Sequence, residues 1–269
     1  MKRIKSSLFI SFLLIASLIF YSCRSVPVTG RNQLSIIPSS ELMAMSFQQY
    51  DTFLKENKVS KDAKKTALIK KIGQKIQKSV EQYMAEKNLS DHLKGYAWEY
   101  NLVESDQVNA WCMPGGKVVF YTGILPICKD EAGIATVMGH EIAHAIAEHG
   151  GERMSQGLLV QLGGMGLQAA LESEPALTQQ LAMAAFGVGA QVGVMLPFSR
   201  LHESEADQMG LIFMAMAGYH PNNAVDFWQR MAAQGGGEPP EFLSTHPSNQ
   251  TRINDLKKLI PEAMQYYKK

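Results

Sequence analysis

The feature that most constrains this chain is the stretch VMGHEIAHAIAEHGG, which runs from Val137 to Gly151. It places histidines and glutamates among apolar residues, where an imidazole or a carboxylate is costly to bury unless it is hydrogen-bonded, paired or bound to a metal. Any fold for this sequence must therefore provide partners for a buried polar cluster.

On a helix, His140 and His144 lie about 40° apart around the axis and one turn along it, so two ring nitrogens can point at one ion. Glu141 is rotated by about 100° from His140 and is placed to reach a water on that ion rather than the ion itself. This H-E-x-x-H pattern is typical of two histidines that hold zinc beside a glutamate general base. A chance match on a surface helix is the alternative.

A catalytic zinc needs a third protein ligand and an open fourth position. Glu148 lies one turn beyond His144, but a ligand on the same helix would crowd the histidines. The segment FSRLHESEADQMG offers Glu203 and Asp207, spaced i,i+4 on one helix face. We assign Glu203 to the metal and expect Asp207 to accept the free N–H of a liganding histidine. Taken alone, the E-x-E-A-D pattern would be better explained as a charged helical surface.

Length and composition indicate one catalytic-sized globular domain. A chain of 269 residues can support one sizeable core, and its net charge of +1 does not indicate binding to nucleic acid.

The N-terminus has the pattern of a secretion signal. Basic residues precede an apolar run from Leu8 to Phe20, which is too short for a comfortable membrane span, and Cys23 follows. We predict a signal peptide over residues 1–22 and lipidation of Cys23, with simple secretion or an uncleaved anchor as the alternatives. The body of the protein would then face the periplasm in a bacterial cell envelope. Arg24, rather than an aspartate, favours the outer membrane.

The expected fold class is mainly α with a small antiparallel β-sheet (α+β). Residues 23–40 are predicted to be an extended tether and residues 41–269 the domain. Helices are expected over residues 41–56, 62–86, 130–150, 199–217 and 224–234 and from residue 248 onward.

Residues 157–196 are rich in glycine, alanine and methionine. Because polar residues interrupt the apolar run, neither half offers about 20 clean apolar residues for a membrane span. We expect a buried helical hairpin, with a membrane-facing or substrate-facing flap as the alternative.

Four motifs occur in order along the chain: NAWCMPGG, GHEIAHAIAEHG, SRLHESEAD and STHPSNQTRI. Together they resemble the M48 family of zinc metallopeptidases, which includes Ste24-like and Oma1-like proteases, and in particular its exported lipoproteins without transmembrane helices. The resemblance implies a zincin-like (gluzincin) domain with one zinc ion per chain on His140, His144 and Glu203. It also implies that Glu141 is the base and that Asp207 supports the site.

His246, in the last motif, has three interpretations that remain open. It could donate a hydrogen bond to the oxyanion of the tetrahedral intermediate. It could instead occupy the open metal position and keep the enzyme latent, or it could simply cap a turn before Pro247.

Residues 109–121 are expected to form strands around a tight turn at residues 114–116 and to supply an edge strand beside the cleft, to which a substrate backbone can add as a further strand. Main-chain pairing reads little side-chain identity, so we expect broad cleavage of unfolded or flexible polypeptides. The residues predicted to bind substrate are Asn109, Ala110, Trp111, Pro114, Gly115 and Gly116.

Two functions compete. The first is a membrane-tethered zinc endopeptidase, to which the resemblance adds a role in envelope protein quality control. The second is an envelope chaperone or assembly factor with a structural zinc site, against which the presence of Glu141 argues. Cys112 and Cys128 are expected to form either a disulfide or two buried free thiols.

Overall fold

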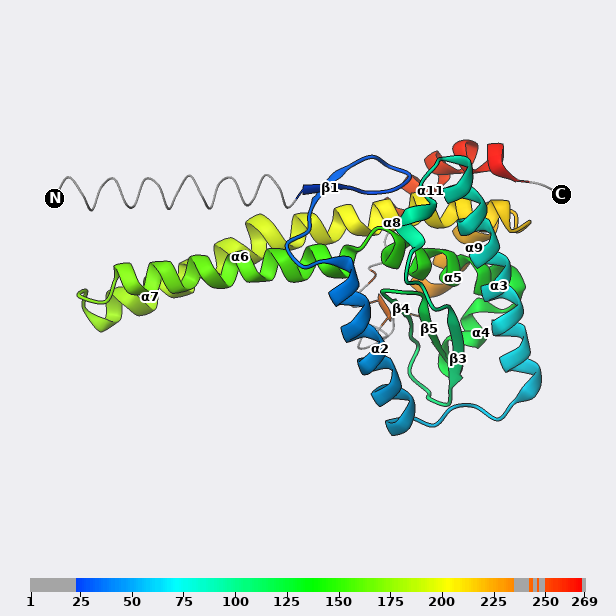
Figure 1. Cartoon of the computed structure of the whole chain (residues 1–269), viewed down its shortest axis with the longest axis horizontal. Helices are drawn as coiled ribbons and strands as arrows, with labels where there is room; N and C mark the ends of the chain where they lie inside the picture. Colours follow the sequence, from blue (N-terminus) through cyan, green and yellow to red (C-terminus); the bar gives the residue numbers. More distant parts are fainter. Residues whose placement is uncertain (1–22, 235–241, 244–245, 247–249, 268–269) are drawn as a thin grey trace. The chain divides into compact units, whose positions relative to one another are not determined.

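The computed structural model describes residues 23–234, 242–243, 246 and 250–267 (Figure 1). The predicted signal peptide lies outside the described residues. The chain divides into two compact units. The first consists of Met1–Ser39 with Glu148–Ser199, and the second of Ser40–Ala147 with Arg200–Lys269.

Helices make up most of the second unit, so the prediction of a mainly α fold with a small sheet is confirmed. Its longer helices are α2 (Ser39–Glu56), α3 (Ala63–Glu86), α5 (Glu131–Ile146), α8 (Leu196–Met216), α9 (Asn222–Ala232) and α11 (Gln250–Ala263). Short helical turns are η1 (Ser90–Leu93), η2 (Thr122–Ile124), α4 (Leu125–Cys128) and η4 (Met264–Tyr266). The strands are β3 (Glu99–Val103), β4 (Ala110–Met113) and β5 (Lys117–Tyr121).

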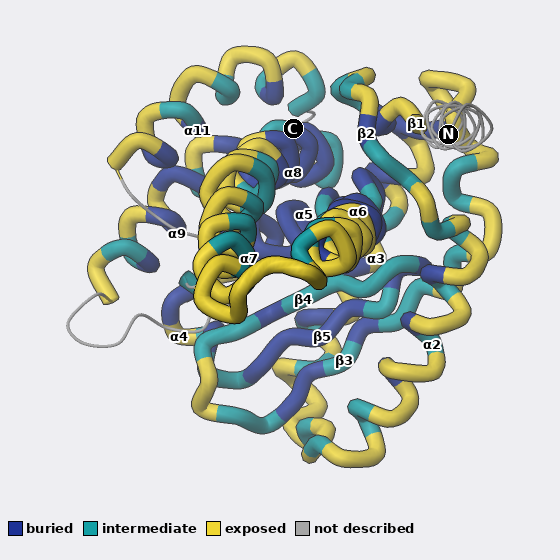
Figure 2. Tube along the Cα trace, turned by 90° about the vertical axis from the view of Figure 1, so that its left-hand side faces the viewer, coloured by how far each residue is buried: buried dark blue, intermediate teal, exposed yellow. Residues whose placement is uncertain are grey.

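The sheet has the strand order β3-β5-β4 and is mixed rather than wholly antiparallel. β4 and β5 form the predicted antiparallel hairpin, but β3 pairs with β5 in parallel. Alternating aromatic and β-branched residues identify strands without fixing their neighbours, and here β5 lies between the other two. Figure 2 shows β5 as mostly buried, with β4 at one edge.

Helix α5 packs against α3, α9 and β4 and is buried over most of its length. As predicted, it begins after Asp130, whose side chain accepts a hydrogen bond from Gly133 N. It ends at Ile146, earlier than the sequence suggested, because Glu148 adopts a left-handed conformation (φ 55°) and breaks the helix before Gly150.

In the first unit, the segment predicted to be a tether contains two strands, β1 (Cys23–Ser25) and β2 (Asn32–Leu34), which pair in antiparallel fashion. Hydrogen bonds join this segment to α6 (His149–Ala170). Arg31 donates two hydrogen bonds, of 3.0 and 2.7 Å, to the carboxylate of the buried Glu152. The backbone N–H of Ile36 donates to Ser155 Oγ at 3.0 Å. The segment is extended, but it is folded onto a helix.

Helix α6 and helix α7 (Ala176–Ala190), which continues through the π-helical turn η3 (Gln191–Met195), form the expected hairpin. The prediction that this hairpin is buried is wrong. Leu162 and Val188 are 61% and 65% exposed, and none of the described residues of α7 is buried. Residues 172–175 form the turn between the two arms, whereas the uncharged residues 178–180 lie within α7 and do not break it. As a result, the continuous helix Ala176–Met216 is long and apolar enough to cross a membrane by length and composition.

Candidate metal centre

The centre forms where α5 crosses α8, at a pair of glycines. A Cβ added to Gly139 would lie 2.9 Å from Gly210 O, and one added to Gly210 would lie 2.9 Å from His140 N. The two helix backbones therefore touch at this point. Because His140 directly follows Gly139, and Asp207 lies one turn before Gly210, the crossing brings side chains from two distant segments together.

The structure brings His140, His144 and Glu203 together, with all their ligand atoms facing one point. The two histidine Nε2 atoms are 3.1 Å apart. Glu203 lies 3.2 Å from His144 Nε2 through Oε1 and 3.4 Å from His140 Nε2 through Oε2. Zinc ligands bound at about 2.0–2.1 Å in a tetrahedron are about 3.3–3.4 Å apart. The nitrogen and oxygen donors and their spacing thus fit a zinc ion.

Asp207 orients His140 from the side opposite the ligand cluster. Its Oδ1 lies 3.0 Å from His140 Nδ1, which leaves Nε2 directed toward the other ligands. In turn, Arg252 on α11 donates to both oxygens of Asp207, at 2.8 and 2.6 Å, and to Glu203 at 3.1 Å. The guanidinium group stacks on Trp228, with its carbon 3.5 Å from the ring centroid.

These contacts set the protonation of the centre. Burial alone would raise the pKa of both Glu203 and Asp207. At Glu203, hydrogen bonds with the neighbouring histidines outweigh burial and lower the pKa. At Asp207, Arg252 and His140 outweigh burial and lower the pKa. Burial lowers the pKa of His140, but the hydrogen bonds with Asp207 and Glu203 outweigh it and raise that pKa to about 9. The centre is therefore built to hold a positive charge, either a proton or a metal ion.

Glu141 is buried beside the ligands without being one of them. Among the described residues, its Oε1 has no hydrogen-bond partner, and His246 Nε2 lies 3.4 Å away. Burial raises the pKa of this carboxyl. A carboxylate in this position can accept a proton from a water held at the centre.

His246 reaches the ligand cluster from a separate segment. Its Nδ1 is 2.9 Å from Glu203 Oε1 and 3.1 Å from His140 Nε2, so it occupies the position of a fourth ligand. Its backbone N–H donates to Phe242 O, and the Phe242 ring stacks on Trp228. The predicted turn-capping role is therefore not needed to explain the residue.

The residues predicted to bind substrate fall into two groups. Ala110 and Trp111 belong to β4, the edge strand that packs against α5, and Asn109 directly precedes it. Pro114, Gly115 and Gly116 form the β4–β5 turn, where both glycines have φ near +83°.

The glycines of this turn pack tightly on neighbouring rings. A Cβ on Gly115 would lie 2.5 Å from Phe47, and one on Gly116 would lie 2.5 Å from Trp98. The turn thus shapes the hairpin, while β4 lies beside the centre.

Cys112 and Cys128 are both free thiols. Burial, together with the Glu141 carboxylate, raises the pKa of Cys112 well above its ordinary value. The raised pKa disfavours the thiolate, which is the reactive form of a cysteine.

Arg252 was not identified from the sequence as part of the metal centre, although it pairs with both Asp207 and Glu203. Arginine 252 follows the THPSNQT stretch that carries His246. The position of Arg252 in the same motif as His246 was the sequence feature that could have linked it to the site.

Two ring nitrogens and a carboxylate around one point, with a second carboxylate beside them on the same helix as the histidines, define a metallopeptidase type of centre. The family model for Peptidase family M48 matches residues 71–260. The chain belongs to this family.

Curated relatives carry related names. A mitochondrial metalloendopeptidase OMA1 of Schizosaccharomyces pombe is 39% identical over 168 residues, which are 62% of this chain and 48% of the relative. The mitochondrial metalloendopeptidase OMA1 of Danio rerio is 32% identical over 261 residues, or 94% of this chain and 54% of the relative. A Beta-barrel assembly-enhancing protease of Yersinia pestis is 31% identical over 166 residues, which are 60% of this chain and 34% of the relative. This chain thus spans about half the length of the mitochondrial relatives and about a third of the bacterial one.

Proposed function

We propose that this protein is a zinc endopeptidase that hydrolyses peptide bonds in unfolded or flexible polypeptides. The observation that carries the proposal is the buried carboxylate of Glu141 beside the cluster of His140, His144 and Glu203. A purely structural zinc site has no use for such a base.

The roles of the side chains follow from their positions. A zinc ion at this centre would supply an activated water and polarise the scissile carbonyl. Glu141 accepts the proton of that water and returns it to the leaving amine. The edge strand β4 pairs with an extended substrate backbone, which selects for unfolded segments and reads little side-chain identity.

We further propose that the protein works in a bacterial cell envelope, tethered through a lipid on Cys23, facing the periplasm and held at the outer membrane. Two bacterial relatives are named Beta-barrel assembly-enhancing protease, which supports a role in envelope protein quality control. Cys23 is exposed, so the described structure leaves it accessible to modification. Mass spectrometry of the mature N-terminus would test the lipid, and fractionation of a Cys23→Ser strain would test the tether.

Digestion of casein by the wild-type protein and by Glu141→Gln tests the enzymatic proposal. We expect the variant to lose activity and to keep its zinc, because Glu141 is not a ligand. If both proteins suppress aggregation of an unfolded client equally and neither cleaves it, the chaperone alternative is correct.

A further inference from the structure

The α6–α7 hairpin of the first unit presents an apolar surface on both of its arms. Large side chains are more than half exposed on both helices. They are Leu162, Met165, Leu177, Leu181, Val188 and Val192. A helix that is apolar all round is expected in a protein core or in a membrane, and the exposure of these residues excludes the core.

The arms also lack charge. Residues 176–199 contain no charged side chain and span about 36 Å as a helix, compared with a hydrocarbon thickness of about 30 Å. Residues 157–171 are likewise uncharged and span about 22 Å. Charges flank the hairpin instead, with the exposed Arg153 at its base and Glu172 and Glu174 at its tip. Charged groups at both ends of an apolar element suit headgroup regions on either side of a hydrocarbon contact.

Two glycines of α6 give room to larger side chains of α7, and small residues at helix contacts are common in membranes. A Cβ on Gly163 would lie 3.2 Å from the Phe186 ring, and Gly164 lies against Phe186 and Met183. This close packing uses the inner side of each arm, which leaves the larger aliphatic side chains on the outside.

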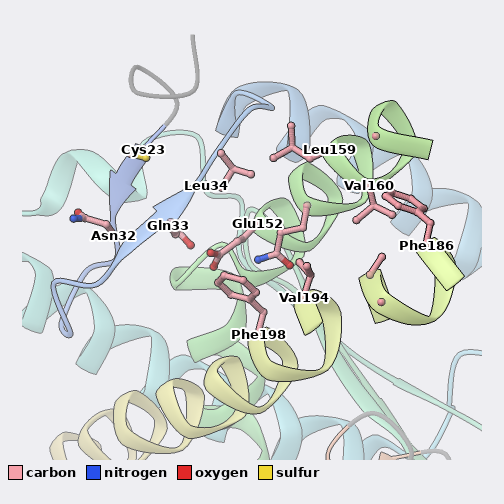
Figure 3. Close-up of a pocket in the computed structure, with 14 residues that line it drawn as sticks. Cys23, Asn32, Gln33, Leu34, Glu152, Leu159, Val160, Phe186, Val194 and Phe198 are labelled. Atoms are coloured by element: carbon pink, nitrogen blue, oxygen red, sulfur yellow. The ribbon is translucent and has the colours of Figure 1, made fainter. Parts of the chain in front are cut away.

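An apolar cavity of about 630 Å³ opens at the base of the hairpin, and Cys23 lies at its edge (Figure 3). Val160, Phe186, Val194 and Phe198 line it with their side chains. The residue predicted to carry a lipid thus lies beside the base of the hairpin.

The cavity also holds two buried amide atoms, Gln156 Nε2 and Gln33 Oε1. Neither has a hydrogen-bond partner within the described part of the chain. An unpaired N–H donor in an apolar cavity suits the ester carbonyl of an acyl chain.

We propose that the α6–α7 hairpin and its basal cavity form a lipid-binding surface that lies in the hydrocarbon of the bilayer carrying the anchor. The charge-free length of the arms and the arrival of the chain at Cys23 beside them favour lipid over a second protein. This inference rests on the proposed lipid anchor at Cys23, and it goes beyond the proposed peptidase activity because it does not depend on cleavage.

The test uses the full-length lipidated protein in phosphatidylethanolamine–phosphatidylglycerol vesicles, with a nitrobenzoxadiazole fluorophore on Val188→Cys. The matched control is Gln48→Cys on α2, an exposed polar position in the second unit. Unsubstituted protein corrects for labelling of the native cysteines, and equal zinc content shows that each variant is folded.

We expect spin labels on lipid acyl chains to quench the fluorophore at position 188 several-fold more than at position 48, and aqueous iodide to show the opposite order. Equal access of iodide to both positions would overturn the proposal. Protection of position 188 from iodide without quenching by acyl-chain spin labels would also overturn it, because a second copy or a polypeptide would then cover the hairpin.

Discussion

Gly139 on α5 and Gly210 on α8 bring the two helix backbones into direct contact. A Cβ added to Gly210 would lie only 2.9 Å from His140 N. The neighbour at each glycine is main chain, which cannot swing away as the end of a side chain can. The lack of a side chain at both glycines therefore sets the distance between the histidines on α5 and Glu203 on α8.

Replacing Gly210 with alanine should separate α5 from α8 and weaken the centre. We expect a loss of about 1–3 kcal/mol in the free energy of unfolding, as for overpacking in a core, and a reduced zinc content. Denaturant unfolding and metal analysis measure the two effects. Gly166→Ala is the control, because that exposed helical position has nothing within 4 Å of the added Cβ. Equal behaviour of the two variants would show that the backbone contact does not hold the centre together.

The ligands could be predicted from sequence because helical spacing is a local property. His140 and His144 lie on one face of any helix, as do Glu203 and Asp207, and the chemistry of the residues then restricts their roles. The crossing at Gly139 and the pairing of Arg252 with Asp207 could not be predicted, because they depend on which helices pack together. The same limit explains the parallel pairing of β3 with β5.

The exposure of the α6–α7 hairpin could not be predicted for a different reason. Apolar composition alone predicts burial, and sequence does not say whether protein or another apolar medium covers a helix. The structure shows that, in the first unit, the described protein does not cover Leu162 and Val188.

Asp207→Asn should lower zinc affinity without removing a ligand. The variant keeps the shape of the side chain but loses the carboxylate that holds His140 Nδ1 and pairs with Arg252. Loss of such a supporting contact typically costs about 10–100-fold in metal affinity, which competition with a chromophoric chelator can measure. Asp255→Asn, at an exposed pair with Lys258, should leave the affinity unchanged. An unchanged affinity in Asp207→Asn would mean that α5 alone orients the imidazole.

As the pH rises, the stability of the metal-free protein should fall, whereas its apparent affinity for zinc should rise. In the metal-free protein the pKa of His140 is raised to about 9. Its protonation therefore stabilises the fold fully below the unfolded value of about 6.5, and this contribution is lost as the pH rises through about 9. Zinc requires the unprotonated imidazole, so its apparent affinity should rise by about tenfold per pH unit over the same range.

Thermal unfolding of chelator-treated protein and zinc titrations at pH 6.5, 7.5 and 8.5 check these two trends. Chelation should also lower the Tm at each pH, because an ion that binds only the folded state stabilises it. A zinc affinity that does not change with pH would show that His140 is already neutral without the metal.

His246→Ala should raise peptidase activity by several-fold rather than abolish it. In the described structure, His246 Nδ1 lies within 3.1 Å of His140 Nε2 and 2.9 Å of Glu203, where it fills the position that a catalytic centre keeps open for water. Removal of the imidazole frees that position and leaves His140, His144 and Glu203 in place. Initial rates of casein cleavage at equal zinc occupancy, with Glu141→Gln as the inactive reference, measure the effect. A fall in kcat with KM unchanged would instead assign His246 to stabilisation of the transition state, since that interaction would be absent from the bound substrate.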